Sequence, residues 1–140
     1  MGGKERSVDH ECFVYVRDLE KIVHKTNGRH SRLIATEKDM GTAGFIMGVH
    51  TMDPGGRSGI HKHVREQEAM YFFSGQGIAT ISGTEYKIEP DSVLLAPAGS
   101  EHGIQNTGKE PLRFVFVYCP PLPEHISREE YFKKAKDKID

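Results

Sequence analysis

The strongest constraint on the fold is a run of short apolar segments separated by turn residues in the second half of the chain. The segments EAMYFFS, GIATIS, EYKIEP and SVLLAP follow one another at short intervals, with SGQG, SGTE and PDS between them. Clusters of glycine, proline, aspartate and serine are typical of tight turns. Because short strands joined by tight turns form antiparallel sheets, the pattern predicts an all-β meander or barrel.

Further strands are predicted on both sides of this run, and a short helix follows them. Apolar alternation or continuous apolar stretches indicate strands at 12–19, 30–37, 43–52, 102–106 and 112–120. Ser127 precedes two glutamates and a modest apolar stripe, so we expect a helix that runs to about Lys138 and docks on the outside of the sheet. The chain is therefore divided into a lead at 1–30 with a candidate edge strand, a β-barrel domain at 31–120, and a proline-rich segment with a helix at 121–140.

The composition indicates one soluble domain without a bias toward nucleic acid or membrane. A chain of 140 residues, 36% hydrophobic and 28% charged, has the size and mix of a single compact domain. No apolar run approaches the roughly 20 residues of a membrane span. Nineteen basic residues balance twenty acidic ones, which favours small molecules or protein partners over nucleic acid. The N-terminal residues lack the apolar centre of a secretory signal, so a cytoplasmic protein is expected.

Two histidines stand one residue apart in the segment GIHKHVREQEAMYFFSGQG, residues 59–77. A glycine-rich turn, DPGGRSG at 53–59, leads directly into them. Because side chains alternate along a strand, His61 and His63 are expected on the same face of one strand. That arrangement presents two imidazoles to one point.

A carboxylate and a third imidazole complete a candidate metal site. By alternation Glu68 shares a face with Met70 and Phe72, where a carboxylate is costly to bury unless a cation compensates it. His102 follows a Pro-x-Gly turn and shares a face with Ile104. Three imidazoles and one carboxylate suit one divalent transition metal per chain, and Mn, Fe, Ni, Zn and Cu are not distinguished by these donors. The predicted metal ligands are His61, His63, Glu68 and His102.

These residues carry a resemblance to the cupin family. The first cupin signature runs Gly, five residues, His-x-His, three or four residues, Glu, six residues, Gly, and its fixed positions are matched by Gly55, His61, His63, Glu68 and Gly75. The second signature is matched by Pro97, Gly99, His102 and Asn106. Its first glycine is replaced by Asp91, and aspartate tolerates left-handed backbone, so the turn is expected to survive.

The resemblance implies the cupin fold, a double-stranded β-helix or jelly-roll barrel, with a divalent metal inside. Small single-domain cupins of this type usually form dimers through their sheets. The sequence is consistent with a homodimer, because the apolar segments CFVYV and FVFVYC, taken as edge strands, would need to be paired or covered.

The function is expected to be enzymatic, with catalytic residues left unassigned. Four protein ligands on a metal that accepts five or six leave open positions for a small carboxylate, enol or diketone, as in a dioxygenase, decarboxylase, isomerase or lyase. The alternative is a non-catalytic module that binds a sugar or another small molecule. Pocket candidates are His50, Met70, Phe72, Ile104 and Tyr118.

Four further side chains receive ordinary interpretations. Tyr71 has the opposite parity to Glu68 and is expected to face outward. Arg57 could pair with a substrate carboxylate, although a solvated loop arginine is the simpler interpretation. Cys12 and Cys119 fit no metal-knuckle spacing and are expected as buried or free thiols, with a disulfide between them left open.

Overall fold

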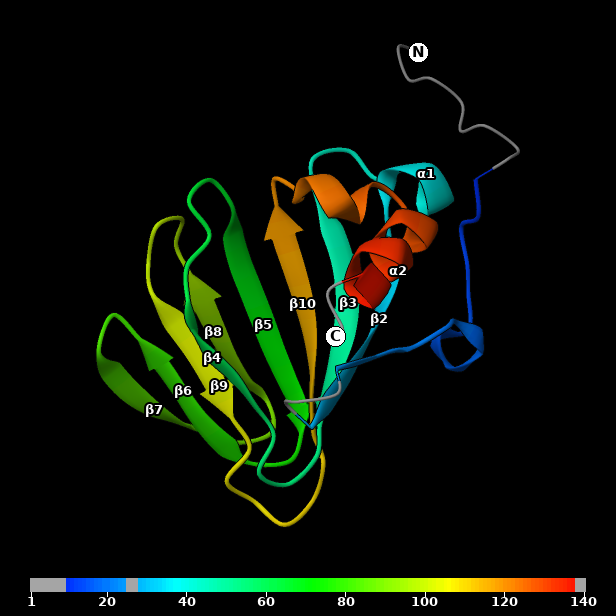
Figure 1. Ribbon diagram of the computed structural model, residues 1–140. Helices are drawn as coiled ribbons and strands as arrows, with labels where there is room; N and C mark the ends of the chain where they lie inside the picture. Colours follow the sequence, from blue (N-terminus) through cyan, green and yellow to red (C-terminus); the bar gives the residue numbers. More distant parts are fainter. Residues whose placement is uncertain (1–9, 25–27, 138–140) are drawn as a thin grey trace.

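The computed structural model describes residues 10–24 and 28–137 and consists mainly of antiparallel strands (Figure 1). The strands are β1 (Ile22–His24), β2 (Arg29–Ala35), β3 (Ile46–Met52), β4 (Arg57–His61), β5 (Gln67–Ser74), β6 (Gly77–Ile81), β7 (Thr84–Ile88), β8 (Ser92–Ala96), β9 (His102–Gln105) and β10 (Leu112–Cys119). The helical elements are η1 (Val16–Asp18), α1 (Glu37–Met40), η2 (Pro123–Ile126) and α2 (Arg128–Asp137). The all-β prediction with a short C-terminal helix is confirmed.

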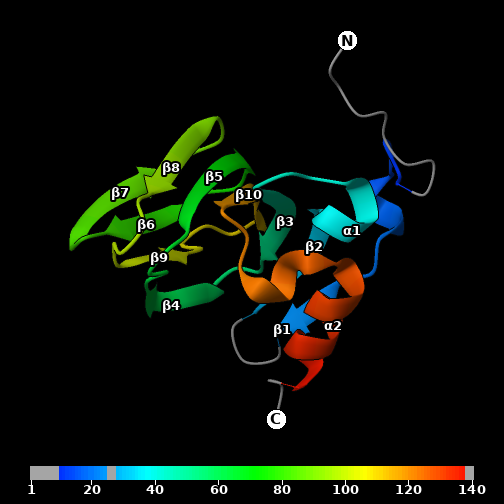
Figure 2. The ribbon, with the colours of Figure 1, turned by 90° about the horizontal axis from the view of Figure 1, so that it is seen from above.

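The strands form two sheets that face each other as layers. One sheet has six strands in the order β1-β2-β3-β10-β5-β8, and the other has four in the order β4-β9-β6-β7. Figure 2 shows the smaller sheet covering the β5, β8 and β10 part of the larger one, while α2 lies over β1 and β2. This arrangement is that of a double-stranded β-helix, as expected.

The core lies between the layers and is built on the inner face of the six-stranded sheet. Alternation places the side chains of Phe114 and Phe116 on this face of β10, and Met70 and Phe72 stand opposite them on β5. All four are at most 2% exposed. Burying one such side chain contributes roughly 1.5–3 kcal/mol, so these strands anchor the site that lies at their ends.

The turn at Asp91 keeps the conformation that glycine has in the second cupin signature. Asp91 has a φ of 70°, in the left-handed region. Its backbone N–H donates to the carbonyl of Phe72, and its Oδ1 accepts a hydrogen bond of 2.7 Å from the Tyr71 hydroxyl. Tyr71 faces outward, as its parity predicts, and is 42% exposed. The substitution at this position therefore preserves the turn.

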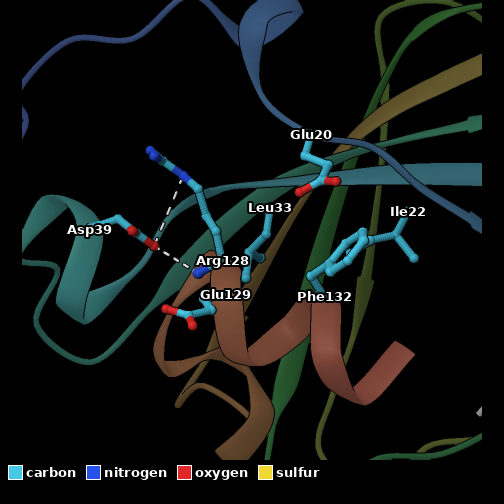
Figure 3. A pocket seen from close by; sticks show the side chains of 7 residues that line it. All are labelled: Glu20, Ile22, Leu33, Asp39, Arg128, Glu129 and Phe132. Carbon is cyan, nitrogen blue, oxygen red and sulfur yellow. Dashed lines mark hydrogen bonds and ion pairs between the residues drawn. The ribbon is translucent and has the colours of Figure 1, made fainter. Parts of the chain in front are cut away.

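Helix α2 is docked through its first residue. The Ser127 hydroxyl accepts from the N–H of Glu130 at 3.0 Å, so the predicted N-cap is confirmed. Arg128 binds the carbonyl of Ile34 through Nε and Nη2, and its backbone N–H donates to Asp39 at 2.7 Å. Figure 3 shows this arginine and Asp39 at the wall of a pocket between α2 and the six-stranded sheet. No helix of residues 10–24 and 28–137 has the length and apolar character to cross a membrane.

Two strand predictions need correction. Residues 12–19 form no strand: η1 lies there, and Phe13 is 73% exposed because no neighbouring strand pairs with this segment. The edge position that the segment was expected to fill is held by β1. The segment FVFVYC is not an edge either, because β10 lies between β3 and β5. Residues 1–9 of the predicted lead and Lys138 of the predicted helix lie outside the described residues.

The two cysteines are exposed and are not joined. Cys12 and Cys119 are both exposed, free thiols. These two described residues form no disulfide, the possibility that the sequence left open. The sequence predicted buried or free thiols, and both thiols are free and exposed.

We expect the chain to form a homodimer through the outer face of the six-stranded sheet. On this face Tyr71 of β5 pairs with Val93 of β8, and Leu95 lies next to them; the three side chains are 42%, 66% and 53% exposed. An apolar sheet face of this kind is typical of an interface. Leu95→Lys should weaken association about tenfold or more, because a lysine there must lose its hydration.

Light scattering at micromolar concentration measures this association. The matched control is Ile60→Lys on β4, a 57% exposed apolar residue of the other sheet, which should remain dimeric. A monomeric mass for the wild type contradicts the expectation.

Candidate metal centre

The four predicted ligands converge on one point between the sheets. His61 ends β4, Glu68 is the second residue of β5, and His102 begins β9. One donor atom from each of these residues and from His63 lies within 4.8 Å of the others. Glu68 and His102 are buried, while His61 and His63 are partly exposed. The cluster therefore lies at the rim of the barrel interior.

His63 does not share a strand with His61, contrary to the prediction. Strand β4 ends at His61, and His63 lies in the connection to β5. The pairing of β4 with β9 shifts register between Ser58 and His61, so regular alternation is lost there. The carbonyl of His63 instead accepts the backbone N–H of Gly99 at 2.8 Å, which holds this connection against the turn before β9.

Hydrogen bonds to backbone carbonyls orient two of the imidazoles. His61 Nδ1–H donates to the carbonyl of Gly59 at 2.7 Å, and His102 Nδ1–H donates to that of Ser100 at 3.1 Å. Fixing Nδ1 in this way leaves Nε2 of each ring as the nitrogen that can bind a metal. The rings of His61 and His102 stand with centroids 4.4 Å apart.

The Glu68 carboxylate and the His102 imidazole contact each other directly within the cluster. His102 Nε2–H donates to Glu68 Oε1 at 3.2 Å. Burial lowers the pKa of His102, but this bond and the bond to Ser100 outweigh it and raise the pKa above its ordinary value. For His63 burial prevails over the nearby Glu68 carboxylate and lowers the pKa. A bound cation would take the place of the His102 Nε2 proton, as metals do when they compete with protons for a ligand.

The donor set fits a divalent transition metal. Three imidazoles and one carboxylate, with two ring orientations fixed by backbone carbonyls, are the ligands and the supporting contacts that such ions use in proteins. Four protein donors leave room for further ligands on an ion that accepts five or six. The described residues offer no feature that selects one metal over another.

A small cavity of about 40 Å³ adjoins the cluster. Of the predicted pocket residues, four line it: His50, Met70, Ile104 and Tyr118. Phe72 does not line it, because it lies further along β5 and packs against Phe114 with ring centroids 5.0 Å apart. The space is small, so a ligand that enters without rearrangement has only a few non-hydrogen atoms.

Tyr118 is the polar side chain of β10 that reaches the cluster. Its hydroxyl lies 3.1 Å from His63 Nε2, within hydrogen-bond distance. Burial and the nearby Glu68 carboxylate raise the pKa of Tyr118 well above its ordinary value. The phenol therefore stays protonated at neutral pH and can donate a hydrogen bond to an oxygen bound beside it.

The cavity also contains Arg29, a residue that sequence reasoning did not select. Arg29 begins β2, and its alternation with the buried Ser31 and Leu33 could have placed it on the inner face. Arg57, which was considered as a carboxylate partner, is exposed and does not line the cavity. His50 stacks on Phe116 with ring centroids 4.2 Å apart; burial, with a contribution from Arg29, holds its pKa well below its ordinary value.

The asparagine of the second signature supports the fold through hydrogen bonds to the backbone. Asn106 is 1% exposed, and its Nδ2 donates to the carbonyls of Met52 at 3.0 Å and Glu110 at 2.9 Å. Its Oδ1 accepts the N–H of Gly108 at 2.9 Å. Asn106 therefore fastens the end of β3 to the loop between β9 and β10 and does not face the cluster as a ligand.

Two antiparallel sheets face each other, and three histidines and one glutamate lie together between them. This fold and this cluster define a class of small β-barrel proteins with a site compatible with a metal ion. The chain belongs to the cupin family: the family model described as "Cupin domain" matches residues 48–118.

Similar proteins differ in what their names state. The chain is 38% identical over 114 residues to an L-ectoine synthase of Bordetella petrii, covering 76% of this chain and 83% of that protein. It is 35% identical over 66 residues to an oxalate-binding protein of Thermotoga maritima, covering 47% of this chain and 54% of that protein. The solved structure of KdgF from Halomonas sp. superposes with a TM-score of 0.70 at 18% identity, covering 81% of this chain and 96% of that one.

Proposed function

We propose that the protein is a metal-dependent enzyme that acts on a small oxygen-rich substrate, a carboxylate, an enol or a diketone. One divalent transition metal per chain is held by His61, His63, Glu68 and His102. When bound, such an ion supplies Lewis acidity, or a site for dioxygen if it is Fe(II). The reaction classes that fit are those of dioxygenases, decarboxylases, isomerases and lyases.

The observation that carries this proposal is the position of the donor cluster beside a cavity. A structural metal site is usually enclosed by protein atoms, whereas here the four donors lie at the rim of a space lined on one side by Met70 and Ile104. These apolar side chains lower the local dielectric on that side of the cavity and so strengthen electrostatic interactions with a bound substrate. Tyr118 supplies a hydroxyl that orients a substrate oxygen.

The relatives support an enzyme but leave a second candidate. The name of the L-ectoine synthase is that of an enzyme, which favours catalysis in a similar chain. The name of the Thermotoga protein states that it binds oxalate, a small dicarboxylate, and so favours a module that binds without turnover. Both candidates place a small oxygen-rich molecule at the same cluster.

The test begins with metal analysis of protein purified without oxygen. We expect about one divalent metal per chain and, with that metal, turnover or dioxygen uptake with at least one member of a panel of small diketones, enols and hydroxy acids. Metal-loaded protein that binds members of the panel but transforms none supports the binding module. Protein that takes up no transition metal refutes the enzyme, and it refutes the binding module too if it also binds no member of the panel.

A further inference from the structure

The cavity beside the metal cluster contains a cationic side chain with a buried N–H group that has no acceptor among the described residues. Arg29 stands opposite Met52 in the pairing of β2 with β3, and both residues line the cavity together with Glu68. The Nε atom of Arg29 is buried and has no hydrogen-bond partner among the described residues. No carboxylate of residues 10–24 and 28–137 forms an ion pair with it within 4.0 Å.

The Nε atoms of the other arginines on the same sheet and its helix each have a hydrogen-bond acceptor. Arg32 Nε donates to the carbonyl of Leu19 at 3.0 Å, and Arg113 Nε donates to Thr51 Oγ1 at 3.2 Å. Arg128, at the pocket in Figure 3, binds Glu11 at 2.9 Å in addition to its contacts with α1 and β2. An arginine whose buried N–H group is left without an acceptor is therefore unusual in this protein, and burying such a donor unpaired is costly.

A second unpaired polar atom belongs to a residue that lines the same cavity. His50 Nδ1 is buried and has no hydrogen-bond partner among the described residues. Its ring is held by stacking on Phe116, so the nitrogen has a fixed direction. In β3 His50 pairs with Ser31, two residues along β2 from Arg29, and both His50 and Arg29 line the cavity. The pair offers a charged donor and a neutral imidazole whose Nδ1 donates in one of its two tautomers.

We propose that Arg29 and His50 form an anion subsite that binds the carboxylate of the substrate while another oxygen of the same molecule faces the metal cluster. This inference rests on the proposed function of that cluster. Planar guanidinium groups bind carboxylates in a bidentate manner, and their charge adds to that of a bound divalent cation. The small cavity favours a short acid, so the substrate class is a 2-oxo or 2-hydroxy acid of three or four carbons.

Two ligands of equal size, one anionic and one neutral, test the subsite. Pyruvate and butane-2,3-dione share a methyl ketone, but pyruvate carries a carboxylate where the dione carries an acetyl group. Binding of each to the zinc-loaded full-length protein is measured by calorimetry. We expect the wild type to prefer pyruvate, and Arg29→Gln to weaken pyruvate binding about 10- to 100-fold while dione binding and zinc content stay unchanged. His50→Phe, which keeps the stacked ring, should weaken pyruvate about threefold or more.

Arg113→Gln is the matched control, since this arginine lies on the outer face of the same sheet and should leave both ligands unaffected. Equal pyruvate affinity in wild type and Arg29→Gln, or an equal loss for both ligands, overturns the subsite while the metal site stands. Wild-type protein that binds zinc but neither ligand also overturns the subsite, whereas the proposed function is decided separately by the metal analysis and the substrate panel. If Arg29→Gln does not fold, Arg29→Lys decides: a selective loss for pyruvate supports the bidentate contact, and an equal loss for both ligands refutes it.

Discussion

Glu68→Gln is expected to abolish specific metal binding and to leave the metal-free protein at least as stable as the wild type. Glutamine keeps the shape of glutamate and can still accept the hydrogen bond from His102, which lies 3.2 Å from the carboxylate. It removes a negative charge that is 4% exposed, whose burial is costly without a cation. Loss of one ligand should lower metal affinity by at least about 100-fold, because even supporting contacts of ligands are worth 10- to 100-fold.

Thermal unfolding with and without zinc measures both effects in one experiment. At a zinc concentration about 100 times its dissociation constant, the wild type should gain about 2.7 kcal/mol in the free energy of unfolding. In Glu68→Gln this gain should disappear. The control is Glu101→Gln, an exposed glutamate next to His102, which should keep the full gain. A zinc-dependent gain of the same size in Glu68→Gln contradicts the assignment of Glu68 as a ligand.

The opposite signs of the two effects are the signature of a site maintained for function. Replacing a residue that supports the fold lowers the free energy of unfolding. A metal ligand, in contrast, costs stability while the metal is absent, so replacing it does not lower the free energy of unfolding of the metal-free protein. The prediction therefore separates a metal ligand from a buried ion pair between Glu68 and His102 that only holds β5 to β9.

Alternation along strands was sufficient to predict the parts of the site that lie on regular β-structure. On β5 it placed Glu68 and Met70 inward and Tyr71 outward, and the structure agrees. It failed where the backbone leaves the sheet. Periodicity does not indicate that β4 ends at His61, so His63 was placed on a strand although it lies in a connection. The spacing of the cupin signature still predicted correctly that both histidines lie in the cluster.

Pairing between distant strands is the information that a single sequence does not contain. Residues 12–19 alternate as a strand would, but no neighbour pairs with them, and η1 lies there instead. Arg29 was overlooked for the same reason. Its position in the cavity depends on β2 lying beside β3, which brings the first residue of one strand opposite the last residue of the other. Arg57 was closer in sequence to the ligands but is exposed.

Phe116→Ala is expected to lower the free energy of unfolding by about 3–5 kcal/mol. The ring of Phe116 is 1% exposed and fills the space above Gly48, the residue opposite Phe116 on β3. A side chain at position 48 would collide with this ring, because a Cβ on Gly48 would lie 2.6 Å from Cε1 of Phe116. The ring also supports His50, which stacks on it. Val93→Ala, at a 66% exposed position of the outer face, should change stability by less than about 0.5 kcal/mol when monomer and dimer are measured separately.

A double-mutant cycle shows whether Gly48 and Phe116 form one packing unit. Gly48→Ala alone should cost about 1–3 kcal/mol through overpacking. In the Phe116→Ala background most of that cost should vanish, because the methyl group then enters the space left by the ring. A remainder is expected, since the Cβ would also lie 2.8 Å from the carbonyl oxygen of Arg32. Denaturant unfolding of the four proteins measures the coupling, and strictly additive effects would show that Gly48 is required by the neighbouring backbone of β2 and not by the ring that positions His50.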